Sequence, residues 1–197
     1  MAGAYDSRTA LIVVDVQNDF ADPGGSLYVR DAEAAVEATN AEIAAARAAG
    51  ALVVYTQDWH PPTTPHFAKD GGTWPVHCVG DSWGAELHPG LAVAGDAERV
   101  RKGTAGEDGY SGFTMVHPTT GDTTPTALDA LLRAHGVATV VVVGLATDYC
   151  VKETALDAVR LGYDTTVVTA GVRPVELEPG DGQRALDALT AAGVALV

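Results

Sequence analysis

Short runs of β-branched and other apolar residues recur along the chain and alternate with longer Ala-rich stretches whose apolar positions repeat with a helical period. Apolar runs without polar alternation are typical of strands that are buried on both faces of a parallel sheet. Six strands are predicted, over residues 10–14, 52–55, 99–101, 139–143, 165–168 and 194–196. Because strands and helices alternate, we expect an α/β fold, a three-layer α/β/α sandwich around a six-stranded, mostly parallel sheet.

Helices are predicted where the helical period coincides with start and stop signals. They cover residues 32–49, 125–135, 147–161 and 182–192. For the first helix, Asp31 is the expected N-cap and Gly50 the expected C-terminal stop. Pro125 suits the opening turn of the second helix, because the first helical position needs no hydrogen-bonded amide.

Two long stretches of the chain show little regular pattern. Residues 56–97 are rich in Pro, Gly, His and Trp, and a second irregular segment covers residues 103–124. Irregular segments of that length in a compact domain are usually functional, which makes residues 56–97 the first place to search for a site. No repeat, linker or low-complexity segment divides the sequence, so we expect one domain over residues 1–197.

Composition limits the class of function. The chain of 197 residues is 47% hydrophobic, which is ample for a buried core. Its formal charge of -14 argues against nucleic acids and anionic membranes as partners. No apolar run approaches the roughly 20 residues that span a bilayer, and the start of the chain does not resemble a secretory signal. We therefore expect a cytoplasmic protein that acts on a small molecule; whether it forms a homo-oligomer is left open.

Charged and nucleophilic residues follow four of the predicted strands. Asp15, Asp58 and Lys102 come at or soon after the ends of the first three, and the loop 144–150, which ends at Cys150, follows the fourth. Ligands of an open parallel sheet bind outside the carboxyl ends of its strands. Taken alone, Asp15 could equally be a helix cap or a partner in a loop hydrogen bond. The convergence of four strand ends favours an active site.

Cys150 is the candidate nucleophile. It stands at the start of a predicted helix, where free backbone amides and the helix dipole favour a thiolate. Asp15 could take the thiol proton and return it to a leaving amine, while Lys102 stabilises negative charge. A lone cysteine is more often a small buried apolar residue, and only the charged neighbours reverse that expectation. The other cysteine, Cys78, forms no CxxC motif, so we expect two free thiols.

One carboxylate and three imidazoles lie within a short window of irregular chain. They are Asp58, His60, His66 and His77. Such a set can hold one divalent metal ion, with Zn, Fe and Mn as candidates. Asp58 and His60 are the stronger pair, because residues two apart on an extended segment point to the same side. A surface loop with scattered histidines is the alternative interpretation.

Five segments carry a family resemblance: LIVVDVQNDF with GGSL just after it (residues 11–27), DWH (58–60), WPVHCVG (74–80), KG with YSGF (102–113) and VVGLATDYCV (142–151). Together they resemble the nicotinamidases within the isochorismatase-like cysteine hydrolases, over nearly the whole chain. The resemblance implies the isochorismatase-like hydrolase fold, with a metal-binding loop region at about residues 56–97. It also implies a reaction, the hydrolysis of nicotinamide to nicotinate and ammonia through a cysteine thioester, in the service of NAD salvage.

Residue roles follow from the resemblance as expectations. It implies a catalytic triad of Asp15, Lys102 and Cys150. It implies a metal held by Asp58, His60 and His77, which His66 joins in some members. A cis peptide between Leu145 and Ala146 would turn the Ala146 amide toward the substrate, where it would form an oxyanion hole with the Cys150 amide. The expected substrate-binding residues are Phe20, Trp74, Tyr110, Leu145, Ala146 and Tyr149, and some members carry His at position 149.

Three other functions compete with this interpretation. Relatives with the same triad hydrolyse other small amides, and the DxH and WPxH segments favour a metal-containing member over amidases without this site. Isochorismatases cleave a vinyl ether without a nucleophilic cysteine, and Cys150 argues against that activity. A catalytically silent metal-binding or interaction protein of the same fold is disfavoured, because all three residue types of the triad are present together with the metal set.

Overall fold

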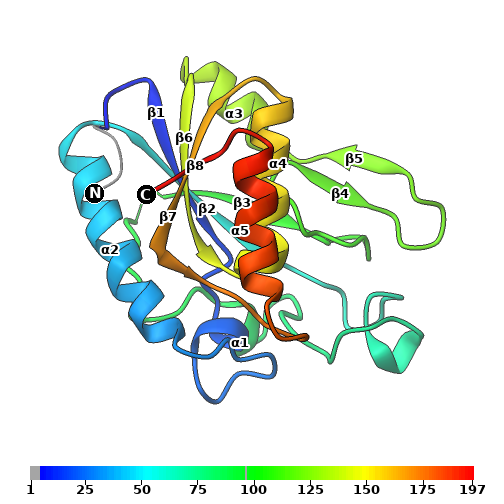
Figure 1. Ribbon diagram of the computed structural model, residues 1–197. Helices are drawn as coiled ribbons and strands as arrows, with labels where there is room; N and C mark the ends of the chain where they lie inside the picture. The colour runs from blue at the N-terminus through cyan, green and yellow to red at the C-terminus, as the bar shows by residue number, and fades with distance from the viewer. Residues whose placement is uncertain (1–4, 96) are drawn as a thin grey trace.

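The computed structural model describes residues 5–95 and 97–197. The prediction of one domain over residues 1–197 includes residues 1–4 and 96, which lie outside the described part of the chain. The main sheet contains β1 (Thr9–Val14), β2 (Leu52–Asp58), β3 (Glu98–Lys102), β6 (Thr139–Leu145), β7 (Asp164–Arg173) and β8 (Ala195–Leu196). The α-helices are α1 (Asn18–Ala21), α2 (Ala32–Ala48), α3 (Leu128–Ala134), α4 (Lys152–Arg160) and α5 (Asp181–Ala191) (Figure 1).

The six strands of the main sheet are arranged in the order β3-β2-β1-β6-β7-β8, and every neighbouring pair is parallel. The chain runs outward from β1 to β2 and β3 and then returns to the other side of β1 with β6. The order of the strands therefore reverses between β1 and β6, which is where open α/β sheets place their ligands. The predicted α/β fold with a six-stranded sheet is confirmed.

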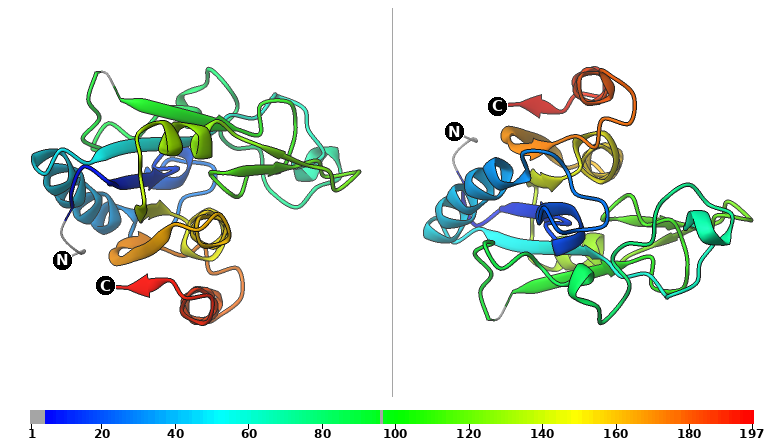
Figure 2. Two further views of the ribbon diagram at one scale, coloured as in Figure 1. Left: turned by 90° about the horizontal axis from the view of Figure 1, so that it is seen from above. Right: turned by 90° about the horizontal axis from the view of Figure 1, so that it is seen from below.

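Helices cover both faces of this sheet, so that Figure 2 shows α2 on one side and α4 and α5 on the other. The strand β1 is buried along its whole length, and its side chains alternate between the two faces. Leu11 and Val13 pack in the cluster that contains Ile43 of α2, whereas Ile12 packs with Leu132 of α3 and with α4 and α5. Two apolar layers therefore hold the central strand in place beneath the site.

The irregular segments contain more structure than the sequence pattern predicts. Residues 56–97 hold two short 3-10 helices, Ala68–Asp70 and Trp83–Ala85. Residues 103–125 include an antiparallel hairpin, β4 (Thr114–Val116) and β5 (Thr123–Pro125), which extends beyond the helices in Figure 1. These strands are only three residues long, too short to leave a periodic signal.

One predicted helix start is wrong, and one predicted N-cap is in place without its capping hydrogen bond. Pro125 ends β5, and α3 begins at Leu128, whose amide donates to the Thr126 hydroxyl at 3.1 Å. The chain needs the intervening residues to turn from the hairpin into the helix. Asp31 does lie at the N-cap of α2, but its backbone is left-handed (φ 61°) and its side chain makes no capping hydrogen bond. Within the described part of the chain, no helix has the length and apolar character to cross a bilayer.

Candidate active site

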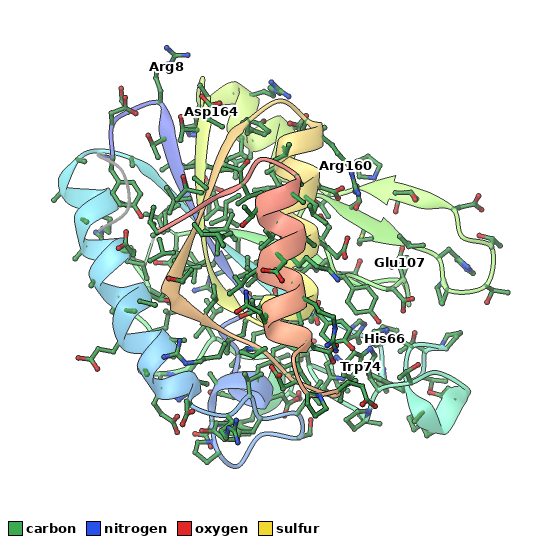
Figure 3. All side chains as sticks on the ribbon, in the orientation of Figure 1. Arg8, His66, Trp74, Glu107, Arg160 and Asp164 are labelled. Carbon is green, nitrogen blue, oxygen red and sulfur yellow. The ribbon has the colours of Figure 1, made fainter. Side chains whose placement is uncertain are left out.

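The candidate site lies at the carboxyl ends of the central strands. Figure 3 shows Arg8, just before β1, and Asp164, the first residue of β7, at one end of the sheet, with His66 and Trp74 at the opposite end. Asp58 and Lys102 are the last residues of β2 and β3 and are partners in the strand register. The parallel register thus brings residues that are far apart in the sequence to one edge of the sheet.

The three residues of the expected triad meet in the buried interior. The Lys102 Nζ atom lies 2.7 Å from Asp15 Oδ2 and 3.7 Å from Cys150 Sγ. One carboxylate oxygen each of Asp15 and Asp58 and the Cys150 sulfur lie within 4.8 Å of one another. Asp15 and Lys102 are 0% exposed. A nucleophile, a carboxylate and an ammonium are therefore in position for proton transfer in a site without bulk water.

Lys102 is held by charged and neutral acceptors on several sides. Its ammonium donates to Asp15, to Asp58 Oδ1 at 2.5 Å and to the Gly109 carbonyl. Burial alone would lower the pKa of Lys102, but the carboxylates of Asp15 and Asp58 raise it well above its ordinary value. The same ammonium overcomes the effect of burial on Asp58 and holds the pKa of that carboxyl well below its usual range. Lys102 is therefore a permanent positive charge between two carboxyl groups.

Asp15 has the features of a general base. Burial raises the pKa of Asp15, although the Lys102 ammonium acts in the opposite direction. The Thr56 hydroxyl donates to Asp15 Oδ1 at 2.6 Å and fixes the orientation of the carboxylate. Sequence reasoning missed Thr56, although its position two residues before Asp58 on an extended strand places both side chains on the same side.

Cys150 is buried in a short π-helix, Thr147–Val151, that leads into α4. Burial raises the pKa of the Cys150 thiol well above its ordinary value; Lys102 lowers it, and the carboxylate of Asp15 raises it further. Burial and the nearby carboxylates therefore oppose the thiolate that the helix start favours. A protonated thiol at rest makes a neighbouring base necessary for nucleophilic attack.

The three histidines of the predicted metal site form one buried cluster. One ring nitrogen from each of His60, His66 and His77 lies within 4.8 Å of the others. Asp58 Oδ2, the oxygen that does not bind Lys102, lies 3.8 Å from His60 Nε2 and 3.9 Å from His77 Nε2. The structure therefore brings together all four residues that the sequence pattern singled out, His66 included.

The hydrogen bonding of these rings fits a metal ion. His66 Nδ1 lies 2.5 Å from Asp108 Oδ1 and His77 Nδ1 lies 2.7 Å from the Pro75 carbonyl. Both partners can only accept, so each Nδ1 carries the proton and each Nε2 keeps a free lone pair. Among the described residues, neither ring nitrogen of the buried His60 has a hydrogen-bond partner. Unpaired buried nitrogens are rare in proteins, and a metal ion would satisfy them.

The protonation of the cluster agrees with this fit. Burial lowers the pKa of His66, and burial lowers the pKa of His77 to about 4. Both rings are therefore neutral at neutral pH, which is the form that binds metal ions. Three imidazoles and one carboxylate oxygen are a donor set typical of divalent first-row metals such as Zn, Fe and Mn.

A pocket with an empty volume of about 370 Å³ opens beside these groups. Its walls include the candidate nucleophile Cys150, the cluster residues Asp58, His66 and His77, and all six of the expected substrate-binding residues: Phe20, Trp74, Tyr110, Leu145, Ala146 and Tyr149. Leu27 and Val175 also line it and were missed. Leu27 lies within the GGSL segment, whereas no local signal marks Val175. The pocket is mainly apolar, which suits a flat aromatic ligand.

Aromatic rings close one side of this pocket. The Trp74 Nε1 atom donates to the Tyr110 hydroxyl at 2.8 Å, and the Trp74 and Tyr149 rings meet edge to face with centroids 4.8 Å apart. Trp74 belongs to the long loop after β2, Tyr110 to the segment after β3 and Tyr149 to the turn after β6. Three separate connections thus build a single wall.

The backbone next to the nucleophile has two specific features. The peptide bond between Leu145 and Ala146 is cis, as the family resemblance implies. The Asp148 carboxylate accepts hydrogen bonds from the backbone amides of Val175 and Glu176, both at 2.9 Å. Asp148 therefore ties the turn that carries Cys150 to the segment that carries the pocket residue Val175. Sequence reasoning missed this contact, which joins positions 27 residues apart.

Comparison with known proteins decides the family. The Isochorismatase domain family model matches residues 9–197. The chain belongs to the isochorismatase family. A nicotinamidase from Escherichia coli (strain K12) is 39% identical over 203 residues, which cover 95% of this chain and 93% of that protein. The resemblance that the sequence motifs indicated is confirmed.

Two solved structures share the fold of this isochorismatase-family chain. The pyrazinamidase of Pyrococcus horikoshii in complex with zinc is 37% identical, with a TM-score of 0.85 over 96% of this chain and 98% of that one. PnC1 from L. infantum in complex with nicotinate is 35% identical, with a TM-score of 0.89 over 100% and 96%. The first holds a metal and the second a pyridine carboxylate, the two kinds of ligand for which the cluster and the pocket have suitable chemistry.

Proposed function

We propose that this isochorismatase-family protein hydrolyses nicotinamide to nicotinate and ammonia through a thioester on Cys150. The observation that carries the proposal is the arrangement of Asp15, Lys102 and Cys150 beside a buried His cluster on one aromatic-lined pocket. Support comes from relatives that are named nicotinamidase and from the nicotinate complex of PnC1.

In the first half-reaction, Asp15 accepts the proton of Cys150 and the resulting thiolate adds to the carboxamide carbon. Lys102 lies 3.7 Å from the sulfur and compensates the negative charge while the proton is on Asp15. Collapse of the tetrahedral adduct breaks the C–N bond, and the amide nitrogen takes the proton from Asp15 and leaves as ammonia. The raised pKa of Asp15 makes it a stronger base than an exposed aspartate.

The negative charge that develops on the carboxamide oxygen has to be stabilised by hydrogen-bond donors that lie close to this oxygen. The backbone amides of Ala146 and Cys150, from the turn after β6, are assigned to this role in our proposal. Both residues line the pocket. In the second half-reaction a water molecule gives one proton to Asp15 and attacks the thioester carbon. The C–S bond then breaks, the proton on Asp15 returns to the Cys150 sulfur, and nicotinic acid is released and ionises to nicotinate, with its proton passing to solvent or to ammonia.

Asp58, His60, His66 and His77 are the residues that would hold one divalent metal ion. When bound, the ion supplies a Lewis acid that anchors a ring nitrogen and withdraws electron density from the ring. The aromatic wall of Trp74, Tyr110 and Tyr149, with Phe20, binds the faces and edges of the ring. These contacts orient the carboxamide toward Cys150.

Ammonia release from nicotinamide by the purified protein tests the proposal. Wild type is expected to release ammonia and nicotinate, and Cys150→Ala is expected to lose activity by at least about 10⁴-fold because no nucleophile remains. Cys78→Ala is the matched control, since that buried cysteine does not line the pocket. Full activity of Cys150→Ala would refute the mechanism, whereas ammonia release only from another small amide, such as pyrazinamide, would refute the substrate alone.

The cytoplasmic location and the role in NAD salvage remain predictions. We propose the role in NAD salvage because nicotinate formed from nicotinamide is a precursor that salvage reactions can use. Growth of a nicotinate-requiring cell on nicotinamide, with wild type and Cys150→Ala compared, tests the pathway. Growth supported equally by the two proteins would contradict it.

A further inference from the structure

The segment between Lys102 and Tyr110 carries a carboxylate that takes part in none of the steps described above. The Asp108 Oδ1 atom lies 2.5 Å from His66 Nδ1. Figure 3 shows its chain neighbour Glu107 on the same side of the molecule as His66. We propose that Asp108 is a positioning residue for the metal centre, which fixes the tautomer and ring orientation of His66 and strengthens metal binding through it. This inference rests on the metal centre proposed above.

The contact is specific in its chemistry. A carboxylate offers only acceptors, so the proton of His66 must be on Nδ1 and the Nε2 lone pair is free for a metal. A negatively charged partner also makes the imidazole a better donor than a neutral partner does. His77 has the corresponding bond to the Pro75 carbonyl, which is neutral. Of the two cluster histidines whose Nδ1 is bonded, His66 is therefore the one with a charged partner.

The backbone holds Asp108 firmly in place. Its amide donates to the Val116 carbonyl at 2.7 Å, and the Val116 amide donates back to Asp108 at 2.9 Å. The Thr64 hydroxyl donates to the Gly106 carbonyl at 2.9 Å. The loop that carries His66 is therefore joined twice to the segment after β3, and that segment is anchored on strand β4.

The same segment also reaches the catalytic lysine. Gly109, the next residue after Asp108, offers its carbonyl to the Lys102 ammonium. Lys102 in turn binds Asp58, which faces His60 and His77 with its other oxygen. Asp108 thus contacts the metal cluster directly, through the His66 imidazole. Gly109 contacts it indirectly, through the Lys102 ammonium that binds Asp58.

The affinity for Zn²⁺ tests the proposal, measured by competition with a chromophoric chelator and independent of nicotinamide hydrolysis. Asp108→Ala is expected to weaken zinc binding by about 10–100-fold. Asp108→Asn, which keeps an acceptor oxygen without the charge, is expected to lie between Asp108→Ala and wild type. Asp122→Ala is the matched control. Asp122 is an exposed carboxylate in the loop between β4 and β5, where it accepts a hydrogen bond from the Thr120 hydroxyl. This variant is expected to bind zinc as wild type does.

A double-mutant cycle distinguishes positioning of His66 from a general effect on the loop. If Asp108 acts through His66, then His66→Ala and His66→Ala/Asp108→Ala bind zinc equally well. Wild-type affinity in Asp108→Ala, or a full additional loss in the double variant, would overturn the proposal. The proposed metal centre fails separately, if wild type itself binds no zinc or if His60→Ala binds it unchanged.

Discussion

At the residue scale, Lys102 joins the two halves of the site. It binds Asp15, the proposed base, and Asp58, which faces the histidine cluster. An ammonium with 0% exposure is stable only because these carboxylates and the Gly109 carbonyl replace its water shell. The ionisation state of one group therefore depends on the presence of the other two.

Replacement of Lys102 by Met tests this dependence. Two carboxyl groups would then face each other without a counter-charge, which costs about 3–5 kcal/mol if both stay ionised. Since Lys102 lowers the pKa of Asp15, that pKa rises in the variant and Asp15 takes up a proton. The base must be ionised to act, so we expect kcat/KM to fall at neutral pH and its acidic limb to move to higher pH. A pH profile of kcat/KM measures both effects.

The control for this variant is Lys69→Met. Lys69 is half-exposed, forms an ion pair with its neighbour Asp70 and lies 5.9 Å from the centre of the Phe67 ring, so its loss is expected to leave the pH profile of kcat/KM unchanged. An unshifted acidic limb in Lys102→Met, with activity reduced equally at every pH, would show that Lys102 does not set the ionisation of Asp15.

The proposed catalytic residues could be predicted from the sequence more readily than the residues that position the site. Asp15, Lys102 and Cys150 could be located because each lies at or soon after the carboxyl end of a strand in a parallel sheet, whose topology brings strand ends together. Asp108 reaches His66 across 42 positions from an irregular segment, where no period indicates direction. The burial that raises the pKa of the Cys150 thiol could not be predicted either, because the sequence shows a helix start but not what surrounds it.

At the scale of elements, the pairing of β1 with β6 sets the distance between base and nucleophile. Gly144 of β6 stands opposite Val14, the residue before Asp15, and a Cβ atom at this position would lie 2.1 Å from the Val14 carbonyl oxygen. The register of β6 against β7 also shifts between Val142 and Gly144. A glycine at this point allows the two backbones to approach closely.

Gly144→Ala is accordingly expected to destabilise the protein by about 2–5 kcal/mol, from backbone strain at φ +111° and from collision with β1. Displacement of β6 also separates Cys150 from Asp15, so we expect kcat/KM to fall by about 10²-fold or more. Urea unfolding and the ammonia assay measure the two effects.

Gly136→Ala separates strain from collision. Gly136 also has a positive φ of 66°, but an added Cβ meets nothing within 4 Å, so only a cost of about 1–2 kcal/mol is expected. Equal losses of stability in the two variants would contradict the close-approach argument.

Element boundaries show where local pattern is not sufficient. The strands β1 and β6 were located correctly because long apolar runs have few alternatives to burial between helices. The strands β2 and β7 extend beyond their predicted ends, to Asp58 and to Arg173. Pro125 satisfies the rule for a helix start and equally suits the edge of a short hairpin, and the contact of β5 with β4 decides between them. That contact is tertiary, so the sequence around Pro125 does not contain it.

At the scale of the whole molecule, the histidine cluster couples metal binding to folding. His60, His66 and His77 come from different positions of one long loop, and the unfolded chain does not bring them together. An ion that binds the folded state alone stabilises it by about 2.7 kcal/mol at a free concentration of 100 Kd. For a domain of this size that corresponds to a rise in Tm of about 5–11 °C.

Metal removal is therefore expected to lower the Tm by that amount, and added Zn²⁺ to restore it in a concentration-dependent way. His60→Ala is expected to abolish the shift, because both nitrogens of that ring lack any other partner in the described part of the chain. His135→Ala is the control, since the ring of that exposed histidine lies at the end of α3, where its Nδ1 atom is 2.9 Å from the Leu131 carbonyl oxygen. It should keep the full shift. A Tm that does not respond to chelator or zinc in wild type would show that the cluster binds no metal with useful affinity, and the unpaired nitrogens of His60 would then need another partner.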